Sequence, residues 1–412
     1  MASLDSPSSD RSPDASEASR GAFSSLRPAD LRGSAQLATE ATLETTRLVE
    51  AVHARVLACL QPGSPDVRLR TAGLTGWIYR TVRQIARLSG YGTTWALGAV
   101  EQVTKPTARP DAEARQWVLS ALNGVLGDHL AASENPLARS FSLRTLDGRR
   151  IDGNAPGAAA TNTLIVFVHG LCLSDRAWIP AEHDRSGHVE ALAAAVDGTP
   201  VLARYNTGRP IEVNGQALST HLQQLTADPD GPSRIVLVTH SMGGLVARSA
   251  VRHAHGTGDR WPDLVTETVY LGTPHRGAPL ERAGAWIEKQ LRRSPFTAPF
   301  ADFADRRSRG IQDLRHGAVA QSDASAPSAS PHDDTAFSSG RTLYVAGALT
   351  PEFPTRNPVG DGLVPVSSAL DTSAFSRPSD RRVFEGLGHL DLLHAPVVTE
   401  HLRRWLSAAD RR

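Results

Sequence analysis

One serine of this sequence stands in a setting that suits a nucleophile. Residues 235–238 form a short apolar run, and Thr-His-Ser-Met-Gly-Gly follows it directly, with Ser241 as the serine. Leu245 then continues a pattern that is typical of a helix. We therefore predict a strand, a sharp turn and a helix, with the Ser241 hydroxyl presented at the apex of the turn.

The sharp turn around Ser241 requires small residues two positions before and two positions after it. Gly243 meets this requirement, whereas Thr239 places a β-branched side chain where a glycine is usual. Thr239 therefore leaves the local geometry and the turnover rate open. The helix after Ser241 is expected to direct backbone N–H groups and the positive end of its dipole at the site, which favours stabilisation of an oxyanion.

With this motif in place, the segment from Arg139 to the C-terminus resembles the lipase and esterase branch of the α/β-hydrolase superfamily. It is similar to bacterial lipases and to the group of proteins like GPI-inositol deacylase. The resemblance implies a mainly parallel central sheet flanked by helices, and a serine, an acid and a histidine that follow one another in this chain order. It covers about two thirds of the chain and does not explain the N-terminal third.

The resemblance also implies an oxyanion hole. Leu171 follows a His-Gly pair at the end of the apolar run 164–168, and Met242 follows the serine. By analogy with lipases, the backbone N–H groups of these two residues hold the oxyanion. We interpret His169 as a packing residue under this loop, and Cys172 as a small packing residue rather than a reactive thiol.

A serine hydroxyl needs a general base, and the base needs a group that orients it. Following the chain order of the superfamily, we assign the acid to Asp361, in a Gly-Asp-Gly-Leu-Val-Pro segment after the expected strand 342–346. We assign the base to His389, which precedes Leu-Asp-Leu-Leu. His394 is the alternative base, and Asp391 is expected to cap the helix that follows.

Two further loops follow strand ends and are expected to border the site. Tyr205 and Asn206 come after the expected strand 200–203 and either contact the substrate or brace the turn. His275 lies in a Gly-Thr-Pro-His-Arg-Gly segment, and lipase-like proteins share a similar pattern there. We expect His275 to support the site without acting as a base.

The elements that must position these residues alternate between strands and helices. Apolar runs that predict buried strands occupy 164–168, 200–203, 235–238, 269–271 and 342–346, with a shorter candidate at 382–384. An alternating segment with an Asp-Gly turn predicts a hairpin over 141–151. This order predicts an α/β fold with a mainly parallel sheet, whose chemistry lies at the carboxyl ends of the strands.

Composition suggests three parts. Residues 1–34 are rich in Ser, Asp and Pro and are expected to form a disordered tail. Residues 35–135 are predicted to be helical, and residues 139–412 are predicted to form the α/β-hydrolase domain. Within that domain, residues 278–340 interrupt the sheet and form either an apolar lid with a mobile link, or a packed helix followed by a disordered loop.

A helix over 74–89 carries apolar residues every three or four positions, with Arg80, Arg83 and Arg87 off that stripe. Such a basic amphipathic helix either docks on the main domain with a solvated basic face, or lies on a membrane or lipid surface. The pattern alone does not choose between them.

The overall composition narrows the function classes. A formal net charge of +1 gives no sign of a nucleic-acid partner. Two cysteines in different predicted domains make no disulfide framework, the first twenty residues lack a secretory pattern, and no apolar run is long enough to span a membrane, which favours a cytoplasmic protein. The fifteen histidines show no zinc-type spacing, so we expect neither a metal nor a cofactor.

These features predict a serine hydrolase that cleaves carboxylic esters, with lipid-like acyl groups, through an acyl-serine intermediate. One alternative is an acyltransferase or a polyester depolymerase that uses the same triad. Another is a non-catalytic protein that binds a lipid or membrane surface, with 74–89 as its working part. The intact set of Ser241, Asp361 and His389 favours the hydrolase.

Overall fold

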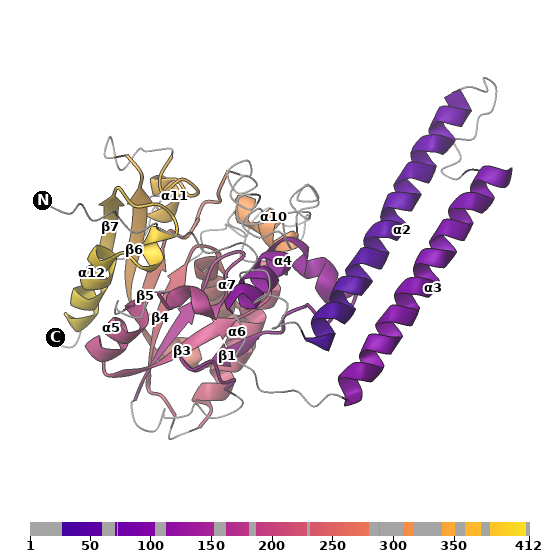
Figure 1. Ribbon diagram of the computed structural model, residues 1–412. Helices are drawn as coiled ribbons and strands as arrows, with labels where there is room; N and C mark the ends of the chain where they lie inside the picture. The colour runs from indigo at the N-terminus through magenta and orange to yellow at the C-terminus, as the bar shows by residue number, and fades with distance from the viewer. Residues whose placement is uncertain are drawn as a thin grey trace, which may run out of the picture. The chain divides into compact units, whose positions relative to one another are not determined.

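The computed structural model describes residues 27–59, 71, 73–103, 113–151, 162–180, 187–228, 231–279, 288, 308–316, 340–350, 359–371 and 380–408 (Figure 1). The chain forms two compact units. The smaller unit extends to Gln116 and includes Glu134–Leu137, and the larger unit comprises Trp117–Ser133 and everything from Ala138 onwards. Among the described residues, no helix has the length and hydropathy that crossing a membrane requires.

One sheet organises the larger unit. Its described strands lie in the order β1-β3-β2-β4-β5-β6-β7. They are β1 (Ser142–Arg144), β2 (Thr163–Val168), β3 (Gly198–Arg204), β4 (Arg234–His240), β5 (Val265–Leu271), β6 (Arg341–Ala348) and β7 (Asp380–Glu385). Only β1 runs antiparallel to its neighbour among these strands, and the other pairs are parallel. This is the α/β-hydrolase architecture that the sequence predicts, with each predicted strand in place.

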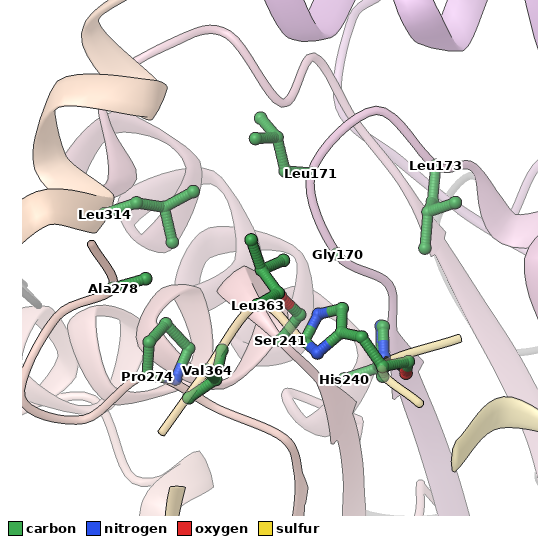
Figure 2. A pocket seen from close by; sticks show the side chains of 11 residues that line it. Gly170, Leu171, Leu173, His240, Ser241, Pro274, Ala278, Leu314, Leu363 and Val364 are labelled. Atoms are coloured by element: carbon green, nitrogen blue, oxygen red, sulfur yellow. Dashed lines mark hydrogen bonds between the residues drawn. The ribbon is translucent and has the colours of Figure 1, made fainter. Parts of the chain in front are cut away.

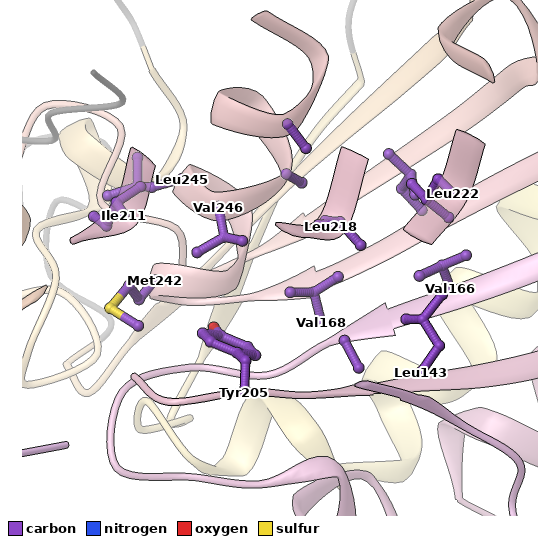
Figure 3. Packing of buried hydrophobic residues seen from close by; sticks show 14 of the residues in the cluster. Leu143, Val166, Val168, Tyr205, Ile211, Leu218, Leu222, Met242, Leu245 and Val246 are labelled. Atoms are coloured by element: carbon purple, nitrogen blue, oxygen red, sulfur yellow. The ribbon is translucent and has the colours of Figure 1, made fainter. Parts of the chain in front are cut away.

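Helices cover both faces of this sheet because its central strands are apolar on both sides. Alternate side chains of β2 belong to two separate cores. Figure 3 shows Val166 and Val168 of β2 within the first of them. The first core includes α4 (Glu113–Ala132), α6 (Ile211–Thr226) and α7 (Met242–Thr257). The second core includes α5 (His188–Ala195) and α12 (Pro396–Ser407). The remaining described helices of the larger unit are short: η1 (Asp175–Trp178), η2 (Trp261–Leu264), α10 (Arg309–His316), α11 (Val366–Ala369) and η3 (Asp391–Leu393).

The predicted hairpin over 141–151 is present but short. Thr145 N–H donates to the Arg149 carbonyl, and Ile151 N–H donates to the Leu143 carbonyl. The second arm forms only an isolated antiparallel bridge, between Arg144 and Arg150. It adds no further strand to the sheet.

The smaller unit contains two long helices, α2 (Pro28–Cys59) and α3 (Gly73–Val103). The structure corrects the expected tail over 1–34, because α2 begins at Pro28; residues 1–26 lie outside the described residues. Proline suits the first turn of a helix, and the Asp30 carboxylate accepts the Arg27 N–H at 2.9 Å and the Arg115 guanidinium at 2.6 Å. These local contacts outweigh the polar composition of the segment.

A second boundary also differs from the expectation. The helical region was predicted to extend to residue 135, yet Trp117–Ser133 belongs to the larger unit. Ala121 and Val125 of α4 are almost fully buried in the same core as β2. A Cβ at Gly124 would lie 2.1 Å from Cys172 Sγ, which shows how closely α4 packs on the hydrolase core. A helical pattern reveals the helix but not the surface against which it packs.

A buried ion pair connects β3 with the loop that follows β2. Arg204 Nε and Nη2 donate to the two carboxylate oxygens of Asp175, at 2.6 Å and 2.9 Å. The Asp175 side chain is 1% exposed. A paired arrangement with two parallel hydrogen bonds is the geometry in which a buried charge is tolerated.

Replacing one partner of this pair is expected to be costly. Asp175→Ala leaves the Arg204 charge buried and should lower the free energy of unfolding by about 3 to 5 kcal/mol. Urea unfolding followed by tryptophan fluorescence measures this. The double variant Asp175→Ala/Arg204→Met, which removes both charges, should recover part of the loss. Equal losses in the single and double variants would contradict the prediction.

Candidate active site

Ser241 occupies the strained turn that the sequence predicts, between β4 and α7. Its backbone lies at φ 53° and ψ −127°, a region that side chains other than glycine rarely adopt. Its N–H donates to the Leu271 carbonyl at 2.8 Å, which ties the turn to β5. Gly243 is required, because a Cβ there would lie 2.3 Å from the Val168 carbonyl oxygen.

Thr239 fits this turn despite its bulk. Its hydroxyl donates to the Val269 carbonyl of β5 at 2.9 Å, and the side chain is fully buried. The branched side chain is therefore accommodated between neighbouring strands, and its polar atom has a partner. This removes the structural difficulty that the sequence raised for the turn.

Asp361 and His389 form a direct pair. His389 Nδ1 lies 2.7 Å from Asp361 Oδ2, and both side chains are buried. The other oxygen, Asp361 Oδ1, accepts the N–H groups of Leu363 and Val364 at 3.0 Å and 2.8 Å. The backbone of His389 is fixed as well, because its N–H donates to the Asp361 carbonyl at 3.0 Å.

One pocket brings three of the predicted site residues together, whereas Asp361 and Met242 do not line it (Figure 2). Ser241, His389 and Leu171 all line it. The rest of its lining is mostly apolar and consists of Gly170, Leu173, His240, Pro274, Ala278, Leu314, Leu363 and Val364. Leu314 belongs to α10, and its carbonyl accepts the Ala278 N–H at 3.1 Å, so a described part of the 278–340 excursion borders the site. Within this excursion, 278–279, 288, 308–316 and 340 are described, and the remaining residues lie outside the described residues.

The loop that carries Leu171 is held by hydrogen bonds on both sides. Tyr205 Oη donates to the His169 carbonyl at 2.5 Å, and Cys172 N–H donates to Thr207 Oγ1 at 3.1 Å. Within the described residues, the structure records no acceptor for the Leu171 N–H itself. Met242 is the first residue of α7, so its N–H has no acceptor within that helix. Among the described residues, neither predicted oxyanion donor therefore has a recorded backbone acceptor.

For Tyr205 and Asn206, the sequence left substrate contact and bracing of the turn as alternatives, and the structure favours bracing. Both side chains are fully buried, and neither lines the pocket. Tyr205 stacks on His169 with 4.4 Å between ring centroids. Asn206 Nδ2 donates to the Gly127 carbonyl of α4 at 2.8 Å, and its Oδ1 accepts the Gly208 N–H at 3.1 Å. These bonds use their polar atoms to hold the loops.

The other histidines of the sequence motifs do not act as bases in this arrangement: His169 and His275 are buried, and His394 lies outside the pocket lining. Burial lowers the pKa of His169 to about 4 and that of His275 well below its usual value, so both stay neutral. His275 Nδ1 lies 3.1 Å from the Arg248 guanidinium, and its ring contacts Tyr270. His394, the alternative base, is exposed and does not line the pocket.

Two neighbours of the site differ in outcome. Burial raises the pKa of the Cys172 thiol to about 12, which suits the predicted packing residue. Asp391 lies in the first turn of η3 but does not cap it, because the N-cap position is Leu390 and the Asp391 carboxylate instead accepts the Gly388 N–H at 2.8 Å.

His240 is the residue that sequence reasoning missed. Its Nε2 lies 3.0 Å from the His389 carbonyl oxygen, and the two rings are 4.7 Å apart. Burial lowers the pKa of His240 well below its usual value, so the neutral ring donates through Nε2. Its position directly before Ser241 was the available signal, but it was taken only as part of the motif.

Comparisons with known proteins place this chain near lipase-like sequences. A family profile described as a PGAP1-like alpha/beta domain matches residues 209–335. A triacylglycerol lipase of Burkholderia plantarii is 27% identical over 179 residues, which is 42% of this chain and 42% of the lipase. A triacylglycerol lipase of Pseudarthrobacter phenanthrenivorans is 28% identical over 126 residues, which is 29% of this chain and 35% of the lipase. The chain thus matches less than half the length of these relatives.

Among solved structures, the mature form of the Bacillus licheniformis lipase BlEst2 covers 65% of this chain and 98% of its own, with a TM-score of 0.42 and 18% identity. The family profile covers β4, the Ser241 turn and the loop of His275. Together with the mainly parallel sheet, these matches show an α/β-hydrolase-type fold in a chain that is similar to a PGAP1-like alpha/beta domain and to triacylglycerol lipases.

Proposed function

We propose that this protein hydrolyses carboxylic esters through an acyl-serine intermediate, with Ser241, His389 and Asp361 as its triad. The observation that carries the proposal is the 2.7 Å pair of His389 and Asp361, with His389 and Ser241 lining one pocket. The similarity to triacylglycerol lipases supports an ester as the substrate.

The hydrogen bond to Asp361 fixes the tautomer of His389. An ionised carboxylate only accepts, so Nδ1 carries the proton and Nε2 keeps a free lone pair. Nε2 takes the Ser241 proton as Oγ attacks the ester carbonyl carbon. The developing oxyanion is held by the N–H groups of Leu171 and Met242, and His389 then protonates the leaving alcohol. Water repeats the sequence on the acyl-enzyme and releases the acid.

His240 supports this base by position. His240 donates a hydrogen bond to the backbone carbonyl of His389, whereas Asp361 bonds to the His389 ring. His389 is therefore held at its carbonyl, its N–H and its Nδ1. Such restraint keeps the imidazole in the orientation that proton transfer needs.

The apolar lining supports an acyl chain as the part of the substrate that enters the pocket. Leu171, Leu314 and Leu363 come from three separate segments and line the same space as the serine. Apolar walls exclude water from the reacting atoms and favour burial of methylene groups. The substrate class we propose is therefore an ester with an acyl chain longer than acetyl.

Covalent labelling tests the nucleophile. A fluorophosphonate probe should label the folded wild-type protein, and Ser241→Ala should abolish the labelling because no other hydroxyl is activated by His389. Ser249→Ala, which removes another buried serine hydroxyl of α7, is the matched control and should be labelled normally. Labelling that persists in Ser241→Ala, or its absence from wild type, would refute the assignment.

Gly272 offers a test of the acid–base pair. Gly272 has φ +57°, and a Cβ on it would lie 3.1 Å from Asp361 Oδ2 and 3.3 Å from His389 Cε1. Gly272→Ala should therefore lower kcat for ester hydrolysis by about tenfold or more, because the methyl group displaces the pair. Gly258, at φ +76°, has open space around the same position. Gly258→Ala should carry a similar backbone strain and leave kcat unchanged; an equal loss in both variants would assign the effect to strain alone.

Chain-length preference tests the substrate class. Because each buried methylene contributes about 0.8 kcal/mol, kcat/KM for p-nitrophenyl esters should rise by at least about tenfold from acetate to octanoate. Steady-state hydrolysis over a series of acyl lengths measures this. A strict preference for acetate would contradict an acyl-chain pocket while leaving the triad intact.

A further inference from the structure

In the smaller unit, one face of α3 packs on α2. The Arg83 guanidinium pairs with the Glu50 carboxylate, and the His53 ring nitrogen Nδ1 lies 3.1 Å from Tyr79 Oη. Gly90 lies against Thr39, since a Cβ there would overlap its side chain. These contacts settle which side of α3 faces its partner helix.

The opposite face of α3 exposes large apolar and aromatic side chains. Leu88 is 75% exposed and Trp95 is 78% exposed. Trp77, Ile85 and Tyr91 are exposed to a similar degree. At 3.6 residues per turn, Trp77 and Trp95 are five turns apart and point the same way, about 27 Å from each other along the axis. We define the α3 apolar face as Trp77, Ile85, Leu88, Tyr91 and Trp95.

Over residues 73–100, the charged side chains of α3 have one sign. The sequence from 73 to 100 contains three arginines and no Asp, Glu or Lys. Arg83 is neutralised by Glu50, whereas Arg80 and Arg87 are exposed and lie on one flank of the apolar face. This arrangement is complementary to a surface that is apolar with anionic groups at its edge.

Among surfaces of that kind, a lipid membrane matches the side chains of the α3 apolar face best. Trp and Tyr prefer the boundary between hydrocarbon and headgroups, and arginine side chains reach from such a position to phosphate. A second copy that packs through the same face would bring no acidic side chain to these arginines, because residues 73–100 contain neither Asp nor Glu.

We propose that the α3 apolar face docks on a membrane surface that contains anionic lipids. The helix lies in the plane of the interface, with Trp77, Leu88 and Trp95 directed into the headgroup region. Arg80 and Arg87 contact lipid phosphates. The contact does not depend on the hydrolase chemistry, since none of these residues belongs to the pocket.

Vesicle flotation of the full chain tests this proposal. The vesicles are phosphatidylcholine with and without phosphatidylglycerol, at low and high salt. Leu88→Gln/Trp95→Gln removes two anchors of the face, and Arg80→Gln/Arg87→Gln removes the charges. Val397→Gln, which replaces an exposed apolar residue of α12, is the matched control. Circular dichroism and fluorophosphonate labelling confirm that each variant is folded.

The wild-type chain and Val397→Gln should float with the anionic vesicles. The bound fraction should fall by about tenfold or more in Leu88→Gln/Trp95→Gln. Arg80→Gln/Arg87→Gln should lose the preference for phosphatidylglycerol and the salt dependence. Equal flotation of the Leu88→Gln/Trp95→Gln variant, or no flotation of wild type at low salt, would overturn the proposal. A wild-type dimer that this variant converts to a monomer, without flotation, would assign the face to a second copy instead.

Discussion

The strained backbone of Ser241 is the constraint around which the site is arranged. A side chain at φ 53° costs about 1 to 3 kcal/mol and persists only where the surroundings leave no alternative. Here the Ser241 N–H is bonded to β5, and α7 begins at the next residue. The loop after β2 can approach this turn closely because position 243 carries no side chain. Gly170 in that loop has the same effect, since a Cβ there would lie 2.9 Å from Ser241 Cβ. The turn is therefore as rigid as the buried sheet on which it stands.

The same sheet brings distant parts of the chain to this turn. β6 lies between β5 and β7, and the loops after β6 and β7 carry Asp361 and His389. Each of these two residues makes both a side-chain and a backbone contact with the other. A register shift in either strand would separate them, because both contacts require one relative placement of the two loops. The pair is thus a consequence of strand pairing rather than of local sequence.

The sequence predicted the strands well because their apolar runs are continuous and their turns carry glycine. The residues 235–243 define a strand and a turn within a few positions, so local pattern is sufficient there. The sequence was less informative where a polar side chain could either contact a substrate or hold a loop. Tyr205 and Asn206 follow the end of a strand, and only tertiary contacts show that Tyr205 bonds to the His169 carbonyl and Asn206 to α4. The limits of α2 and the attachment of α4 likewise depend on long-range packing, which periodicity does not encode.

The packing of α4 on the loop that carries Leu171 also affects how readily Cys172 reacts. Cys172 lies one residue from Leu171, yet its sulfur is enclosed against Gly124 and its thiol stays protonated. A protonated, enclosed thiol reacts slowly with peroxides and alkylating agents. The loop that carries Leu171 can therefore contain a cysteine without becoming a target for oxidation. Electrophiles that enter the pocket meet the Ser241 hydroxyl rather than a reactive thiol.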